Sequence, residues 1–130
     1  MKQNTAEYLT KAERSISASR QLLEQGHPDF SASRSYYAIF YCVTALFEEE
    51  GRQFSSHAKI IGAFGYEYIR TGKLPQHLGT RVQKAFDLRS EGDYGLEFSV
   101  TEPEARETLQ HAEEFLQEIR RYLMGDDKKE

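Results

Sequence analysis

The chain has 130 residues, which is enough for one domain with a hydrophobic core of its own. Its net charge is −4, whereas a protein that binds nucleic acid without specificity is basic overall, so any contact with RNA must be local. The single cysteine, Cys42, excludes an internal disulfide bond and fits a reducing cytoplasm, and residues 1–4 lack the apolar stretch of a signal peptide, so we expect a cytoplasmic protein.

Helical periodicity runs along the chain, and no segment alternates as a strand does. The first predicted helix begins near Thr5, a residue suited to the N-cap, and ends at the Gly-His-Pro sequence of residues 26–28. A second helix follows over residues 29–50. Either Ser55 or Ser56 can then cap a third helix, which ends at a glycine, Gly72.

The second half of the chain predicts two more helical segments. One starts near residues 73–75 and breaks at residues 91–95, where two glycines within four residues disfavour helix. The last starts with Thr101 as N-cap, followed by proline and acidic residues in the first turn. We therefore predict an all-α fold, a four- to five-helix up-and-down bundle over residues 1–124, with a polar C-terminal tail at residues 125–130.

The most informative segment is residues 36–47, which contain no charge and five aromatic side chains. An amphipathic surface helix carries one apolar stripe of roughly 100° or more, but this segment offers apolar groups nearly all round. Such a helix needs two partners, so in a small chain the pattern predicts a homodimer formed through this helix. The segment is shorter than the roughly 20 residues that span a bilayer, and we expect no membrane contact.

Three segments, taken in order, resemble a known family: residues 33–41 (SRSYYAIFY), 56–61 (SHAKII) and 85–94 (AFDLRSEGDY). Together they are similar to a stand-alone prokaryotic branch of the HEPN domains (higher eukaryotes and prokaryotes nucleotide-binding). The resemblance implies a HEPN-like bundle that dimerises and often pairs with a minimal nucleotidyltransferase in a toxin–antitoxin module. It also implies, for catalytic members, a metal-independent endoribonuclease that uses an arginine and a histidine four to six residues later.

This chain departs from the ribonuclease pattern at the histidine. Arg89 stands at the family position, but no histidine follows it at the required spacing. Because histidine transfers protons near neutral pH, its absence predicts weak or no ribonuclease activity. Two other pairs have the spacing, Arg52 with His57 and Arg106 with His111, but roughly one such pair is expected by chance in a chain of this composition.

The remaining candidates for catalysis are Arg89, Asp93 and Tyr94, and together with Ser35 and Tyr36 they are the candidates for binding a nucleotide, RNA or partner. A guanidinium can hold a phosphate in a bidentate manner. The phenol of Tyr94 is able to accept a nucleotidyl group, a modification that the resemblance implies for some tyrosines near this motif. The opposing interpretation is structural: Arg89 pairs only with a neighbouring acid, and Tyr94 is buried.

We predict a HEPN-like component of a nucleotidyltransferase-associated, toxin–antitoxin-type module that binds its partner and a nucleotide or RNA. Two alternatives stay open: a metal-independent endoribonuclease with an altered site at Arg89, Asp93 and Tyr94, or a scaffold module without chemistry. The four histidines lack metal-ligand spacing and no phosphate-binding glycine loop is present, so we expect no metal and no cofactor. Cations and aromatic residues interleave around Arg34, but too sparsely to predict an RNA platform.

Overall fold

The computed structural model describes residues 1–95 and 99–125, and these residues are helical without a strand. The elements, in chain order, are α1 (Gln3–Glu24), α2 (Pro28–Glu49), α3 (His57–Phe64), a π-helical turn η1 (Gly65–Ile69), α4 (Gln76–Tyr94) and α5 (Glu102–Leu123). The predicted all-α, up-and-down bundle is therefore confirmed.

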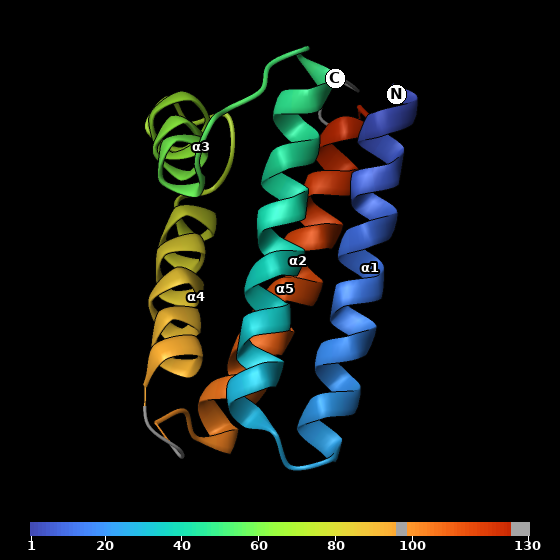
Figure 1. Cartoon of the computed structure of the whole chain (residues 1–130). Coiled ribbons are helices and arrows are strands. Elements are labelled where there is room, and N and C mark those ends of the chain that lie inside the picture. Colours follow the sequence, from blue (N-terminus) through green and yellow to red (C-terminus); the bar gives the residue numbers. More distant parts are fainter. Residues whose placement is uncertain (96–98, 126–130) are drawn as a thin grey trace.

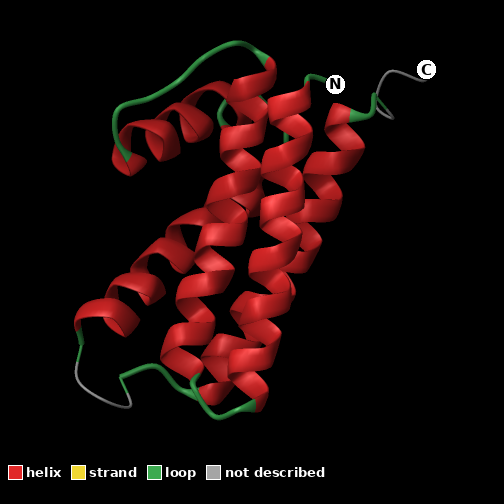
Figure 2. Ribbon diagram, turned by 45° about the vertical axis from the view of Figure 1, so that its right-hand side comes forward, coloured by secondary structure: helices red, strands yellow, loops and turns green. Residues whose placement is uncertain are grey.

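The three longest helices, α1, α2 and α5, stand side by side, and α4 runs along α2 on the other side from α1 (Figure 1). The short α3 lies beside the C-terminal part of α2, on the same side of that helix as α4, as the turned view also shows (Figure 2). The chain begins, and α2 and α5 end, at the same end of the bundle (Figure 1). None of the helices described is both long enough and apolar enough to cross a membrane.

The apolar segment predicted from the sequence forms the centre of α2, which packs against α1, α4 and α5 at once. Tyr36, Val43 and Phe47 have no exposed surface, and Cys42, equally buried, has a thiol whose pKa is raised by that burial. The chain itself thus supplies the second partner that this helix requires. Within the apolar segment, residues 36–47, the half-buried positions are Tyr37, Phe40, Tyr41 and Thr44.

The start of α1 differs from the sequence prediction. The helix begins at Gln3, and Thr5 is fully buried rather than placed at the N-cap. The backbone N–H of Lys2 donates to Glu49 Oε1 over 3.0 Å, which ties the first turn of α1 to the last turn of α2. Packing between the two helices therefore places Thr5 inside the bundle and moves the helix start towards the N-terminus.

Two other predicted caps are confirmed. Ser56 caps α3, because its Oγ accepts a hydrogen bond from the backbone N–H of Lys59 over 3.1 Å. At α5 the side chains of Thr101 and Glu104 each accept a hydrogen bond from the other's backbone N–H, which makes a full capping box.

The fourth helix ends within the predicted range of residues 91–95, but at its far end, because α4 continues through Gly92 to Tyr94 and Gly95 is its C-cap. Gly92 lies where α4 crosses the first turn of α2, and a Cβ at this position would lie only 2.9 Å from the carbonyl oxygen of Asp29. The glycine thus serves a close approach between helices, and tertiary packing outweighs its low helix propensity. Of the predicted polar tail only Gly125 is described, and residues 126–130 lie outside the described residues.

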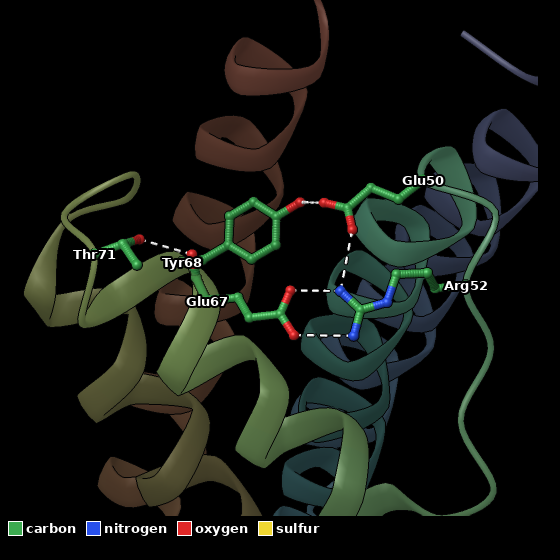
Figure 3. Close-up of polar contacts among 5 residues, drawn as sticks. All are labelled: Glu50, Arg52, Glu67, Tyr68 and Thr71. Atoms are coloured by element: carbon green, nitrogen blue, oxygen red, sulfur yellow. Dashed lines mark hydrogen bonds and ion pairs between the residues drawn. The ribbon is translucent and has the colours of Figure 1, made fainter.

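A polar network ties η1 to the end of α2, a connection that the sequence did not predict (Figure 3). Both terminal nitrogens of Arg52 contact the Glu67 carboxylate, and Nη2 donates to Oε2 over 2.9 Å. Arg52 also forms an ion pair with Glu50. The hydroxyl of Tyr68 donates to Glu50, and Thr71 Oγ1 donates to the backbone oxygen of Glu67 over 2.7 Å. These contacts hold the segment that leads from α2 to α3.

Candidate functional site

The candidate site lies where α4 faces α2, and Arg89 is at its centre. Nη2 of Arg89 donates a hydrogen bond to the Tyr37 hydroxyl over 2.8 Å, and Nε lies 2.8 Å from Oδ2 of Asp93. The guanidinium carbon is 5.5 Å from the ring centre of Tyr36 and 5.3 Å from that of Tyr37. A phenol, a carboxylate and two aromatic rings therefore hold this one cation in place.

Arg89 stays charged, and one of its N–H donors makes no hydrogen bond to a described residue. Burial alone would lower the pKa of Arg89, but Tyr37, Asp93 and Tyr94 together raise it above its usual value. The Asp93 contact is an ion pair outside hydrogen-bond geometry, so the buried Nε has no hydrogen-bond partner among the described residues. With 17% of its side chain exposed, Arg89 presents a fixed positive charge at the surface between α2 and α4.

Tyr36 connects this cation to a histidine on α3. The Tyr36 hydroxyl lies 2.9 Å from Nδ1 of His57, and the imidazole stacks on the Phe40 ring with 3.8 Å between ring centres. Burial raises the pKa of Tyr36 to about 12, while burial and the charge of Arg89 lower the pKa of His57. Both groups are therefore neutral near pH 7, so we assign the phenol as donor to Nδ1 and the imidazole proton to Nε2.

The histidine near Arg89 is thus His57, and no sequence pattern predicts that the two residues lie close together. Arg52, which has the family spacing to His57, is occupied by Glu67 and Glu50 (Figure 3). Arg106, in the other pair with that spacing, is occupied by Glu102 within α5. Spacing along the chain therefore does not identify the histidine near Arg89, which comes from another helix, α3.

Tyr94 ends α4 one turn beyond Arg89, and 80% of its surface is exposed. The structural interpretation, in which Tyr94 is buried, is wrong. Asp93 does pair with Arg89, as that interpretation expected, but Arg89 also binds Tyr37. Arg89, Asp93 and Tyr94 thus lie together at the end of α4.

Ser35 lies apart from this group, although the sequence placed it in the site. Its side chain is fully buried between α1 and α2, with Oγ 2.7 Å from Oγ of Ser19. Ser19 also donates to the backbone oxygen of Ser31 over 2.9 Å, so these small hydroxyls let the two helices pack closely. Tyr36 does belong to the site, but through its ring and its bond to His57 rather than as an exposed contact.

Comparison with known proteins agrees with this arrangement of helices. The HEPN domain family matches residues 5–122. The chain is 31% identical over 124 residues to "Putative toxin MJ0142" of Methanocaldococcus jannaschii, which covers 95% of this chain and 84% of that protein. It is 32% identical over 113 residues to a UPF0332 protein of Thermotoga maritima, covering 87% and 86% of the two chains. It is also 38% identical over 87 residues to the UPF0332 protein glr0978 of Gloeobacter violaceus, covering 67% and 69%.

The family match spans nearly the whole described chain, and the relatives align over most of their own lengths. The chain belongs to the HEPN domain family.

Proposed function

We propose that this protein is the HEPN component of a two-protein, toxin–antitoxin-type module, and that it acts in the cytoplasm with a nucleotidyltransferase partner. The name of the Methanocaldococcus relative supports the toxin part of the proposal. The transferase part follows from the family resemblance of residues 33–41, 56–61 and 85–94 taken together. Partner and nucleotide contact would take place at Arg89, Asp93 and Tyr94.

The observation that carries this proposal is the exposed phenol of Tyr94 beside a fixed guanidinium. Arg89 would bind a phosphate of a nucleoside triphosphate held by the partner. The Tyr94 oxygen would then attack the α-phosphorus, the bond to the β-phosphate oxygen would break, pyrophosphate would leave, and the phenolic proton would pass to a base of the transferase. The product is a nucleotidylated tyrosine, and its bulk and charge would change how the end of α4 binds the partner.

The test is incubation with the proposed nucleotidyltransferase partner and a nucleoside triphosphate, followed by peptide mass mapping. We expect the mass of one nucleotidyl group on the peptide that contains Tyr94, and none in Tyr94→Phe. Tyr66→Phe is the matched control, because Tyr66 is also exposed, at 63%, but lies on η1. Modification at another residue, or unchanged partner binding in both Arg89→Ala and Tyr94→Phe, would contradict the proposal.

A second candidate function, a metal-independent endoribonuclease, is favoured by one observation, the position of His57 next to Tyr36. A neutral imidazole could take the proton of a ribose 2′-hydroxyl, whose oxygen attacks the phosphorus while the bond to the 5′-oxygen breaks. The leaving 5′-oxygen would take up a proton from water, and Arg89 would stabilise the phosphorane charge.

We expect this activity to be weak or absent, because the Nδ1 of His57 is occupied and the buried Tyr36 ring lies beside Arg89. Labelled RNA incubated with the protein and a chelator tests this expectation. Robust cleavage that disappears in both Arg89→Ala and His57→Ala would make the ribonuclease the primary function.

We also propose a homodimer, with the half-buried positions of α2 as its contact. Charging the buried Val43 or Phe47 would unfold the protein, so Thr44→Glu, on the half-buried face, is the sharper variant. Sedimentation should give a dimer that Thr44→Glu weakens. A 15.0 kDa species at every concentration of the unmodified protein would refute the dimer.

A further inference from the structure

The outward face of α3 and η1 is not covered by any other described part of the chain. Ala58, Gly62, Tyr66 and Arg70 recur at every fourth position, and all four are exposed. Tyr66 has 63% of its surface exposed, and the Arg70 guanidinium carbon lies 5.0 Å from its ring centre, so these two side chains share one face. Aromatic and arginine side chains are the types enriched at protein interfaces. We call these four residues the α3 face.

Two glycines of this segment have no role in the packing of the described residues. Glycine inside a helix is less favourable than alanine. At Gly92 the close approach to α2 requires it, whereas a Cβ at Gly62 or at Gly65 would meet nothing within 4 Å, and neither of them has a positive φ. Bare backbone at a surface lets another helix approach more closely than larger side chains allow. The α3 face therefore has the flat shape that a second helix needs.

The turn that carries Tyr66 is π-helical. The backbone N–H of Arg70 donates to the carbonyl oxygen of Gly65, five residues earlier, over 2.8 Å. Such turns are rare and occur frequently at functional sites. Arg52 holds the turn from its other side through Glu67 (Figure 3). The turn is therefore anchored on one side and presents its tyrosine on the other.

The charge of this segment is positive, although the net charge of the chain is −4. Residues 57–73 contain one acid, Glu67, and three cations, Lys59, Arg70 and Lys73. All three cations are exposed, and none of them forms an ion pair with a described residue. The acid is bound by Arg52, whose hydrogen bond lowers the pKa of the Glu67 carboxyl. The exposed surface of the segment is therefore complementary to an acidic partner.

We propose that the α3 face binds an acidic amphipathic helix of a partner protein. That helix lies over Ala58 and Gly62 with its apolar side against the ring of Tyr66, and its carboxylates pair with Lys59 and Arg70. A helix that lays its apolar side on a complementary surface is a recurrent mode of recognition. The end of α4 lies at the other end of the bundle from α3 (Figure 1), so this contact does not depend on the function proposed above.

Charge argues against a second copy of the chain as the occupant. In a symmetric dimer the same patch of both copies meets, which would bring Lys59 and Arg70 of one copy against those of the other. A contact between this face and an acidic region of another copy is not closed by symmetry and would build open chains of molecules. Sedimentation of the unmodified protein detects either arrangement.

The experiment is fluorescence anisotropy of two labelled helical peptides of about 18 residues, each titrated with the full chain. Both peptides carry alanine and leucine on one side of the helix, and the other positions are glutamate in the first and lysine in the second. We expect the glutamate peptide to bind at least about tenfold more tightly. Its affinity should fall as salt is added, because salt screens exposed charges. In an NMR map of amide shifts it should perturb residues 57–73.

Tyr66→Ala and Gly62→Leu should each weaken binding of the glutamate peptide about tenfold, because the first removes the ring and the second fills the flat surface. A Cβ at Gly62 meets nothing within 4 Å, so that variant should keep its fold. Arg70→Gln should weaken binding and reduce its salt dependence. Arg14→Gln is the matched control, because Arg14 is also exposed and forms no ion pair with a described residue, but lies on α1.

The proposal fails if neither peptide binds, or if the lysine peptide binds equally well. An equal loss in Arg14→Gln would mean that overall charge decides binding. Unchanged binding in Gly62→Leu and Tyr66→Ala, with native circular dichroism, would place the peptide elsewhere on the molecule. RNA that displaces the glutamate peptide as effectively as unlabelled peptide would mean that the face accepts any polyanion. A sedimenting mass that falls in Gly62→Leu would make the face a contact between copies.

Discussion

Replacing Gly92 by alanine tests how closely α4 approaches the start of α2. Inside a helix, glycine is about 1 kcal/mol less favourable than alanine, so the exchange should normally stabilise the fold. Here the new Cβ would lie 2.9 Å from the carbonyl oxygen of Asp29, well inside the carbon–oxygen contact distance of about 3.3–3.6 Å. Overpacking of this kind costs about 1–3 kcal/mol, and the opposing atom belongs to backbone that cannot rotate away.

We therefore expect a net loss of about 1 kcal/mol in the free energy of unfolding, or a fall of roughly 3–5 °C in Tm for a chain of this size. Gly62→Ala is the matched control, because Gly62 lies within α3 and a Cβ there meets nothing within 4 Å. That variant should raise Tm by a similar amount. Circular dichroism of thermal unfolding measures both, and a Gly92→Ala variant that is stabilised as much as Gly62→Ala would refute the close approach.

Three further predictions follow from contacts described above. Arg89→Gln should raise the pKa of His57, because burial and the charge of Arg89 both lower it. An unchanged midpoint in an NMR titration of His57 would show that burial alone lowers this pKa. The hydrogen bond from Arg52 lowers the pKa of Glu67, so this bridge stabilises the fold above the ordinary carboxyl pKa of about 4.3 and is lost as pH falls below it. Arg52→Gln should accordingly lower Tm more near pH 7 than at a pH below the ordinary carboxyl pKa, and an equal loss at both pH values would contradict this. Ser19→Ala should lower the free energy of unfolding by about 1–3 kcal/mol, measured by chemical denaturation, because it leaves buried serine hydroxyls of α2 without their partner. A change near zero would show that these hydroxyls find other partners.

Local chemistry made most of the helix ends predictable. Ser56 and Thr101 act as caps through their own side chains and neighbouring N–H groups, so a short window of sequence contains the information. Thr5 and Gly92 were misjudged for the opposite reason, since their surroundings come from α2 and no local pattern reports them. The π-helical turn η1 likewise carried no recognisable signal in the sequence.

The candidate site was predictable only where its residues share one helix. Arg89, Asp93 and Tyr94 follow one another on α4, so the sequence could place them together. His57 and Tyr37 come from α3 and α2, and only the packing of these helices against α4 brings them near Arg89.

The burial of Cys42 gives this protein an intrinsic reporter of its own opening. A thiol reacts as the thiolate, and here burial both excludes reagents and raises the thiol pKa. Since α2 packs against α1, α4 and α5, a reagent reaches Cys42 only when those helices separate. The labelling rate of the native protein, compared with that of the unfolded chain, therefore measures the equilibrium population of open bundles without denaturant, and repeating it with a bound ligand measures how far that ligand closes them.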